Sequence, residues 1–302
     1  MDTSLYWFAR ALVALLQALP LTWVARFGRA GGMLAYWLDA RHRRVALRNL
    51  TMCFGAEKSP AEILALAREN YRRLGENYAC GVKTAGMTFA ELQLYVKCVG
   101  AEKLRPPLPD GGLRSRVIAY GHFGNFELFA RLGQFAPGYQ CACTYRALKQ
   151  PKLDRLFQSL RAGSGCLYFE RRTEGEKLKA LLRRPGVALG FASDQSSGPD
   201  GLRLPFLGHD CSTTSAPAVF ALRYDSPLHP TICYRTGLAR WTIEVGDEVP
   251  IRENGKRRSA EAVMRDVNRA LEAAVRRDPA NWFWVHNRWK EGAAKAGMGD
   301  GG

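Results

Sequence analysis

The chain has 302 residues, 47 % of them hydrophobic, which is enough to bury one large core. Its 44 basic and 28 acidic side chains give a formal net charge of +16, which favours an acidic partner: nucleic acid, an anionic membrane surface, or an acidic protein or substrate. The cations form no block of five or more, and no zinc-finger or RNA-recognition signature occurs, so nucleic acid is the weakest of these partners.

The first fifty residues are predicted to attach the chain to a membrane. From Ala11 to Ala25 the sequence is apolar except for Gln17 and Thr22, but these 15 residues are fewer than the about 20 that span a bilayer. Pro20 would also bend a continuous helix. The segment could span marginally, lie in the interface with its aromatic residues at headgroup depth, or form a core helix of a soluble protein. Six arginines against one acid between residues 26 and 48 favour an anionic leaflet on the cytoplasmic side.

The middle of the chain is predicted to be an α/β fold. Helical patterns cover residues 60–80, begun by Ser59-Pro60, and 88–96, capped by Thr88. Beyond Pro106 short apolar runs alternate with amphipathic segments. The strands are expected at 116–120, 141–145, 166–169, 187–192, 228–235 and 241–245, and the helices at 125–135, 153–163, 174–184 and 259–277. This alternation predicts a mixed central sheet covered by helices.

Three parts are therefore expected: a membrane-associated helix with a basic flank (1–50), a main domain (51–290) and a flexible tail (291–302). The eight cysteines are scattered and no cleavable signal peptide precedes them, which favours buried free thiols in a reducing compartment. Cys141 and Cys143 have neither the spacing nor the second pair that a redox or zinc site needs.

The sequence GHFGNFE, residues 121–127, places polar groups at the end of the 116–120 strand, where reactive groups gather in open α/β sheets. Gly121 and Gly124 leave room around His122. If Asn125 begins a helix, the Glu127 carboxylate can fold back and hold one nitrogen of the imidazole ring, leaving the other to accept a proton from a hydroxyl. Alternatively, His122 caps the helix and Glu127 only favours its positive end. A metal site is not favoured, because the sequence has no HExxH motif and no similar second ligand near His122.

Two more polar clusters follow predicted strands. Arg146 comes directly after strand 141–145, where it could stabilise developing negative charge or a phosphate, or be an ordinary surface cation. Asp194 follows strand 187–192 and is either a site residue or a turn former. Three polar clusters after three strands favour a site over coincidence.

The sequence resembles the bacterial lipid A late acyltransferases of the lauroyl and myristoyl type, which are relatives of the lysophospholipid acyltransferases. The matching stretches run through nearly the whole chain: RRVALRNLTMCFG, GHFGNFE, YRALKQPKLDRLFQSLRAGSG, SDQSSGPDGLRLPFLG, TTSAPAVFALR and NWFWVHNRWK. The resemblance implies that His122 and Glu127 are the H-x4-D/E catalytic pair, that Arg146 and Asp194 are site residues, and that Gly124 and Asn125 shape the pocket.

The resemblance also implies an N-terminal membrane anchor, a catalytic face on the cytoplasmic side of the inner membrane, and an acyl-thioester donor, usually acyl carrier protein. The acceptor would be a phosphorylated, Kdo-bearing lipid A precursor, and no metal or other cofactor is expected. Two positions depart from the family: Phe126 stands where tryptophan is usual, and Asn287 where arginine is frequent. The second change removes a cation near the C-terminus.

The sequence thus predicts a membrane-associated O-acyltransferase, with His122 as general base and Glu127 orienting it. The alternatives are an acyltransferase for another acceptor, such as a lysophospholipid or glycolipid, and a non-catalytic membrane protein that binds acidic partners. The aromatic group Trp282, Phe283, Trp284 and Trp289 could line an acyl pocket but is more typical of core. His286 is expected to be a satisfied buried histidine.

Overall fold

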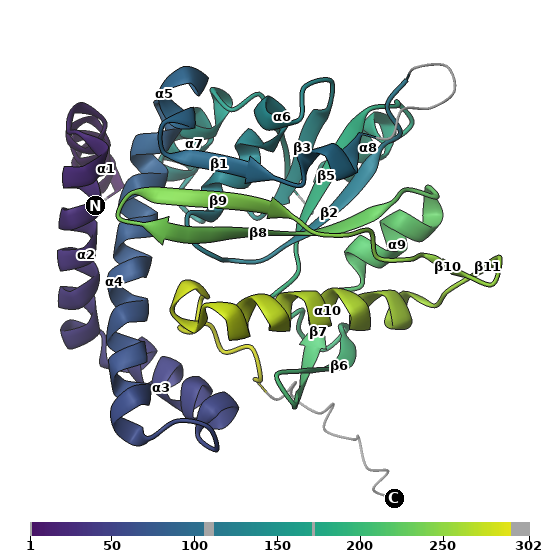
Figure 1. The fold of residues 1–302 in the computed structure, drawn as a ribbon. Coiled ribbons are helices and arrows are strands. Elements are labelled where there is room, and N and C mark those ends of the chain that lie inside the picture. The colour runs from purple at the N-terminus through teal and green to yellow at the C-terminus, as the bar shows by residue number, and fades with distance from the viewer. Residues whose placement is uncertain (1, 106–111, 171–172, 291–302) are drawn as a thin grey trace, which may run out of the picture.

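A seven-stranded sheet forms the middle of the molecule, with strand order β1-β9-β8-β2-β5-β3-β4 (Figure 1). The computed structural model describes residues 2–105, 112–170 and 173–290. The strands are β1 (Val96–Val99), β2 (Arg116–Tyr120), β3 (Gln140–Tyr145), β4 (Leu167–Glu170), β5 (Val187–Ala192), β8 (Leu228–Gly237) and β9 (Arg240–Val245). Neighbouring strands are parallel except β8 and β9, which are antiparallel. The expected mixed sheet is confirmed.

Strands β2 and β5 lie side by side at the centre. Both are continuous apolar runs whose residues are almost all buried, as expected of parallel strands covered on both faces. Their register pairs Tyr120 with Ala192, the last residue of each strand. The backbone N–H of Ser193 then donates to the carbonyl of Tyr120 over 2.7 Å. This register brings the loops that follow the two strands to one edge of the sheet.

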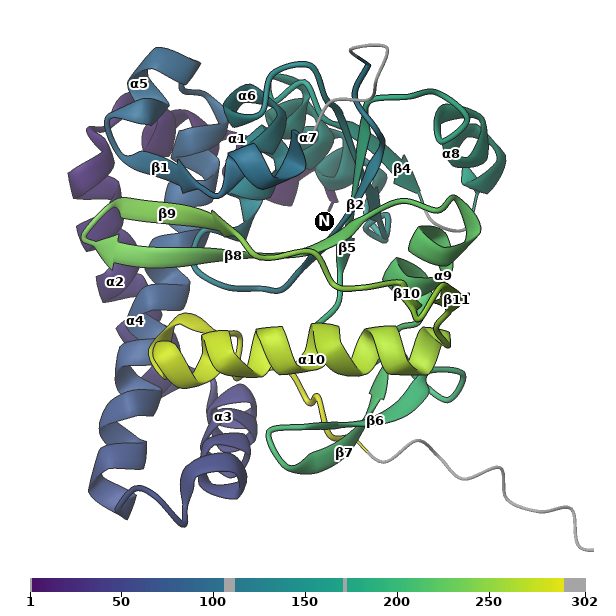
Figure 2. The ribbon, with the colours of Figure 1, turned by 45° about the vertical axis from the view of Figure 1, so that its right-hand side comes forward.

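Helices surround the sheet, and α10 runs beneath it (Figure 2). The helices are α1 (Asp2–Ala18), α2 (Leu21–Leu38), α3 (Ala40–Phe54), α4 (Pro60–Ala85), α5 (Phe89–Gln93), α6 (Leu132–Phe135), α7 (Pro151–Ala162), α8 (Gly175–Leu181), α9 (Ala216–Arg223) and α10 (Ala260–Arg277), with 3₁₀ turns η1 (Ala101–Leu104), η2 (Phe126–Arg131) and η3 (Pro279–Asn281). The start of α4 is as predicted: Ser59 and Glu62 form a capping box, which satisfies two N–H groups that the first turn would leave free.

Several elements differ from the expectations. Residues 126–131, expected as part of an α-helix, form the 3₁₀ turn η2. The antiparallel hairpin of β6 (Leu202–Phe206) and β7 (His209–Thr213) was not foreseen, and neither were strand β1, helix α9 and the short pair β10 (Arg252–Glu253) and β11 (Lys256–Arg257). All eight cysteines have free thiols, as expected. The tail predicted at 291–302 lies outside the described residues.

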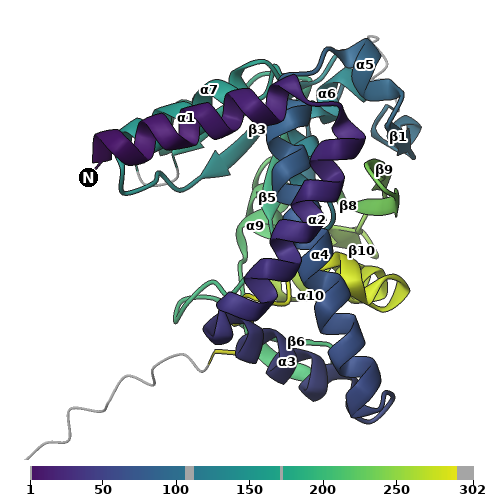
Figure 3. The same cartoon turned by 90° about the vertical axis from the view of Figure 1, so that its left-hand side faces the viewer.

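The N-terminal apolar run forms two helices rather than one. Helix α1 ends at Ala18, and α2 begins after Pro20, the bend that the proline predicted. In Figure 3, α1 crosses the top of the molecule beside α7, and α2 descends alongside α4. Across the described ranges, no helix combines the length and the apolar character needed to cross a bilayer.

Glycines let α2 and α4 approach closely. A Cβ atom on Gly32 would lie 2.0 Å from the carbonyl oxygen of Tyr71, and one on Gly75 would lie 2.1 Å from that of Gly28. Only residues without a side chain permit this backbone contact. The contact fixes α2 against α4, the helix that also forms one wall of the pocket described below.

Candidate active site

His122 and Asp194 meet at the edge of the sheet where β2 and β5 end. The Nδ1 atom of His122 lies 2.8 Å from Oδ1 of Asp194, and the backbone N–H of His122 donates to Oδ2 over 2.7 Å. Asp194 is buried, and 19 % of the His122 side chain is exposed. A carboxylate that only accepts hydrogen bonds places the hydrogen on Nδ1, so the neutral ring has its free lone pair on Nε2.

The Asp194 carboxylate is held by three N–H groups. Besides the two from His122, the indole N–H of Trp282 donates to Oδ2 over 2.8 Å. Burial by itself would raise the pKa of Asp194, but the charge of His122 and these hydrogen bonds outweigh burial and lower the pKa to about 2. The group is therefore ionised at neutral pH.

The pKa of His122 is raised from its ordinary value. Burial lowers it, but the negative charge of Asp194, the hydrogen bond to Asp194 and the charge of Glu127 raise it more strongly. The rings of Phe126 and Phe283 lie 4.8 and 5.7 Å from the imidazole, centre to centre. The side-chain nitrogen of Gln195 lies 3.5 Å from Nε2, at the limit of a hydrogen bond. His122 thus combines a fixed orientation with a raised pKa, which makes its neutral ring a stronger base.

Glu127 does not hold the His122 ring, and this part of the sequence-based prediction is wrong. Its carboxylate pairs with Arg161 of α7 instead, with distances of 2.7 Å from Nη2 to Oε1 and 3.0 Å from Nε to Oε2. The carboxylate bonded to the ring is that of Asp194, because the sheet register brings residue 194 beside residue 122. Glu127 still lines the same small cavity as His122, of about 160 Å³.

Gly124 and Asn125 shape the loop between His122 and Glu127. Gly124 has φ +51°, and a Cβ there would lie 2.6 Å from the carbonyl oxygen of Cys233, so the loop needs glycine at this position. The buried Asn125 donates to the hydroxyl of Thr84 over 3.2 Å. Its side-chain oxygen is buried with no hydrogen-bond partner among the described residues. Such an acceptor suits a ligand with an O–H or N–H group.

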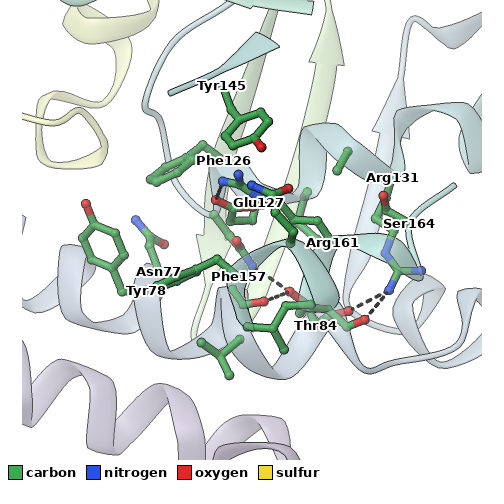
Figure 4. Close-up of a pocket in the computed structure, with 18 of the residues that line it drawn as sticks. Asn77, Tyr78, Thr84, Phe126, Glu127, Arg131, Tyr145, Phe157, Arg161 and Ser164 are labelled. Carbon is green, nitrogen blue, oxygen red and sulfur yellow. Dashed lines mark hydrogen bonds and ion pairs between the residues drawn. The ribbon is translucent and has the colours of Figure 1, made fainter. Parts of the chain in front are cut away.

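A mainly apolar pocket of about 310 Å³ adjoins this loop (Figure 4). Asn77 and Tyr78 of α4 lie at one end, Arg131 and Ser164 at the other, and the Glu127–Arg161 pair lies between them. The apolar lining is Tyr78, Val82, Ala85, Phe126, Leu128, Ala130, Tyr145, Leu148, Phe157 and Leu160. The volume is at the lower end of small-molecule sites, which run from about 300 to 1,000 Å³.

The two cavities share Phe126, Glu127, Ala130 and Arg161 as lining residues. The Glu127–Arg161 pair therefore marks the boundary between the apolar pocket and the cavity that contains His122. At the far end of the pocket, Arg131 donates to the carbonyls of Ala85 and Met87, over 2.8 and 3.1 Å, and so ties the end of α4 to the pocket wall.

Arg146 lies at the rim of the apolar pocket, with an exposed side chain. It does not line the cavity that contains His122, whereas Arg161 does. Arg161 was missed because it lies inside helix α7 and not directly after a strand, where site residues were sought. Its sequence signals were its place in the last turn of an amphipathic helix, which is common on protein surfaces, and its position within the family-like stretch YRALKQPKLDRLFQSLRAGSG.

The C-terminal aromatic residues are divided between core and site. Trp282 and Trp284 are buried in the core, as the sequence favoured. Trp282 nevertheless reaches Asp194, and Phe283 contacts the His122 ring. His286 is partly buried, and its Nε2 accepts from the backbone N–H of Ser196 over 3.0 Å, so it is satisfied as expected.

A mixed α/β sheet that presents a histidine–carboxylate pair beside an apolar pocket defines a protein able to move a proton next to a bound apolar group. Residues 1–291 match the family model for bacterial lipid A biosynthesis acyltransferase. The chain belongs to this family and is an O-acyltransferase of lipid A biosynthesis.

Curated relatives agree with the family match. The chain is 25 % identical over 297 residues to the lipid A biosynthesis lauroyltransferase of Escherichia coli, covering 95 % of this chain and 91 % of that protein. It is 24 % identical over 298 residues to a lipid A biosynthesis acyltransferase of Haemophilus influenzae, with coverages of 95 % and 90 %. It is 25 % identical over 298 residues to the lipid A biosynthesis palmitoleoyltransferase of Escherichia coli, with coverages of 95 % and 91 %.

Proposed function

We propose that this acyltransferase moves a fatty acyl chain from an acyl carrier protein thioester to a hydroxyl of a Kdo-bearing lipid A precursor, with His122 as general base. The observation that carries the proposal is the His122–Asp194 pair: a buried carboxylate fixes Nδ1, so that Nε2 can accept a proton beside an apolar pocket. No metal or other cofactor takes part in the proposed steps.

The reaction follows from this arrangement. Nε2 of His122 accepts the proton of the acceptor hydroxyl as its oxygen attacks the thioester carbonyl carbon, and Asp194 stabilises the imidazolium. The carbonyl electrons form an oxyanion, then return as the carbon–sulfur bond breaks. The thiolate leaves and takes the proton from Nε2, which regenerates neutral His122. The acyl group ends as an ester and the donor as a free thiol.

Arg161 is proposed to stabilise the oxyanion, a role that the sequence suggested for Arg146. Arg161 lines both cavities, so its positive charge lies where the apolar pocket meets His122. In this scheme Glu127 holds Arg161 by a two-point ion pair instead of orienting the histidine. Arg146, at the rim of the apolar pocket, is proposed to contact the anionic donor or acceptor.

The apolar pocket is proposed to hold the acyl chain. Its aromatic and aliphatic lining excludes water from the chain, and its boundary with the His122 cavity is where the thioester carbon would lie. Asn125 and Asn77 line the same pocket, and within the described part of the chain their side-chain oxygens have no hydrogen-bond partner, so they can accept hydrogen bonds from the polar part of a substrate.

The protein is proposed to lie on the cytoplasmic face of the inner membrane through α1 and α2. Exposed large apolar side chains cover these helices: Leu5, Trp7, Phe8, Leu12, Leu15, Trp23, Phe27, Leu34, Trp37 and Leu38. Exposed Arg10 and Arg26 lie on the same two helices. Apolar side chains with flanking cations suit an anionic interface, so an in-plane position is preferred to a spanning helix.

The reaction is tested with purified, detergent-solubilised protein, labelled acyl carrier protein thioesters of several chain lengths, and a Kdo-bearing lipid A precursor. The key variant is His122→Ala, and the control is His42→Ala, which removes an exposed histidine bonded to Asp39 over 2.6 Å. We expect transfer to disappear only in the first variant. His122-dependent transfer to another lipid would discard the proposed acceptor, and a complete lack of transfer would favour a non-catalytic binding protein.

The membrane position is tested by flotation with vesicles that contain anionic lipid. Leu12 on α1 and Val219 on α9 are 44 % and 43 % exposed, and α9 lies on the opposite side of the molecule from α1 and α2 (Figure 1). We expect Leu12→Glu to reduce vesicle binding and Val219→Glu to leave it unchanged. Equal binding of both variants would contradict the proposed surface.

A further inference from the structure

We propose that four residues of the C-terminal segment, Asn281, Trp282, His286 and Arg288, position the His122–Asp194 pair, and that Trp282 does so through its indole N–H. This inference rests on the proposed function, in which that pair transfers the proton. None of the four touches the reacting atoms in that scheme, so they are positioning residues.

Trp282 fixes the rotation of the Asp194 carboxylate. One carboxylate oxygen, Oδ2, accepts hydrogen bonds from the indole N–H of Trp282 over 2.8 Å and from the backbone N–H of His122 over 2.7 Å. The other oxygen, Oδ1, is left to the imidazole. Two donors on one oxygen hold the plane of the carboxylate and aim the second oxygen at Nδ1. Since Trp282 is 1 % exposed, its N–H has no water to turn to.

The same segment holds the loop of His122. Phe123 pairs with Trp282 in an isolated antiparallel bridge, and the N–H of Gly124 donates to the carbonyl of Asn281 over 3.0 Å. The Asn281 side chain donates to the carbonyl of Cys233 on β8 over 2.9 Å. The loop is thus fixed between the sheet and the C-terminal segment.

The other end of the segment holds the residues that follow Asp194. His286 accepts from the N–H of Ser196, and Arg288 donates to the carbonyl of Gln195. Arg288 is 0 % exposed, and among the described residues no carboxylate forms an ion pair with it. Its guanidinium instead donates to Gln195, Ser212 and Thr213. Burying a cation carries a large desolvation penalty, which a residue that only fills space would not require.

The test compares two tryptophans of the same segment. Trp282→Phe removes the N–H that reaches Asp194. Trp284→Phe removes an equally buried N–H, which donates to the carbonyl of Pro279 over 2.7 Å and contacts neither member of the pair. Each variant is assayed for acyl transfer across pH and for thermal stability. The imidazole proton on Nδ1 of His122 is followed by NMR and identified by its loss in His122→Ala.

For Trp282→Phe we expect kcat to fall about 10- to 100-fold with KM little changed, since small misplacements of reacting groups cost rates of this order. The low-field Nδ1 proton signal should weaken or move, and the acid limb of the kcat profile should shift to lower pH as the contact with Asp194 loosens. Trp284→Phe should keep both the signal and the pH profile, even where its melting temperature falls.

The proposal is overturned if Trp282→Phe keeps wild-type kcat and the wild-type proton signal. It is also overturned if both variants lose activity in proportion to their stability with unchanged pH profiles, because Trp282 would then serve only the core. Wild-type protein that transfers no acyl chain would overturn the proposed function instead. The proton signal would still decide whether Trp282 fixes the pair.

Discussion

Replacing Asp194 by asparagine tests the arrangement of the site most directly, because it removes the charge and keeps the shape. In the wild type, both carboxylate oxygens accept hydrogen bonds from His122, and one of them also accepts from Trp282. An asparagine oxygen can still accept from Trp282 and from the backbone of His122. Its amide nitrogen then faces Nδ1, where it can only donate. The ring must present a lone pair at Nδ1 and carry its hydrogen on Nε2, where it cannot act as the base.

The expected loss follows from that tautomer. The equivalent aspartate-to-asparagine change in the serine-protease triad lowers kcat about 10⁴-fold, and we expect a fall of about 10³- to 10⁴-fold here. The variant also loses the stability linked to the carboxylate. A pKa lowered from 3.8 to about 2 corresponds to roughly 2 kcal/mol of unfolding free energy at neutral pH. This figure already includes the interaction of Asp194 with His122.

The assay measures kcat for acyl transfer and urea unfolding of both proteins at pH 7. The control is Asp39→Asn, which alters an exposed aspartate–histidine pair on the surface and should change neither quantity appreciably. A variant Asp194→Asn that retains kcat within about tenfold of wild type would refute the assignment of Asp194 as the partner that sets the tautomer of His122.

Two of the three further predictions concern the same site, and the third concerns the contact between α2 and α4. The kcat of the wild type should fall as pH drops through the raised pKa of His122, because the protonated ring cannot accept a proton, and a pH–rate profile checks this. The part of the unfolding free energy that depends on Asp194 should be fully present above about pH 4 and be lost towards pH 2, because the pKa of this carboxyl group is lowered on folding. The unfolding free energies of wild type and Asp194→Asn, measured at decreasing pH, should therefore converge. Gly32→Ala should destabilise the protein by about 1–3 kcal/mol, because its Cβ would lie 2.0 Å from the carbonyl oxygen of Tyr71. Gly31→Ala on the same helix meets nothing within 4 Å and should be neutral or stabilising; equal melting temperatures for the two variants would contradict the helix contact.

Much of the sheet could be predicted because its central strands are continuous apolar runs. Strands β2 and β5 begin and end at the residues expected from sequence, and both are buried on two faces. Strand β1 was missed because its four residues, VKCV, are too few for an alternation of apolar and polar side chains to be recognised. The η2 turn differs from the expected α-helix because an amphipathic segment of this length does not distinguish a 3₁₀ turn from an α-helix.

The sequence predicted which residues belong to the site better than it predicted which of them bond to one another. His122 and Asp194 were both expected from their positions after strands, and the structure brings them together. Their contact depends on the pairing that sets Tyr120 opposite Ala192, and two strands that are buried on both faces show no side-chain alternation from which this pairing could be read. The sequence instead suggested Glu127, the nearest carboxylate along the chain. Sequence proximity was misleading, because the 3₁₀ turn directs Glu127 towards Arg161 on α7.

In the proposed mechanism, the two ion pairs of the site perform two separate tasks that a single histidine–glutamate pair would have to combine. The His122–Asp194 pair is buried at the carboxylate and bound to the core through Trp282, so its geometry is rigid and suits proton transfer. The Glu127–Arg161 pair is 33 % and 25 % exposed and lines both cavities, so it can meet a substrate whose charge changes during the reaction. Loss of Arg161 should therefore lower kcat while leaving the pH dependence set by His122 in place. A shift of that dependence in Arg161→Met, with Glu127→Gln alongside, would show that the two pairs act as one.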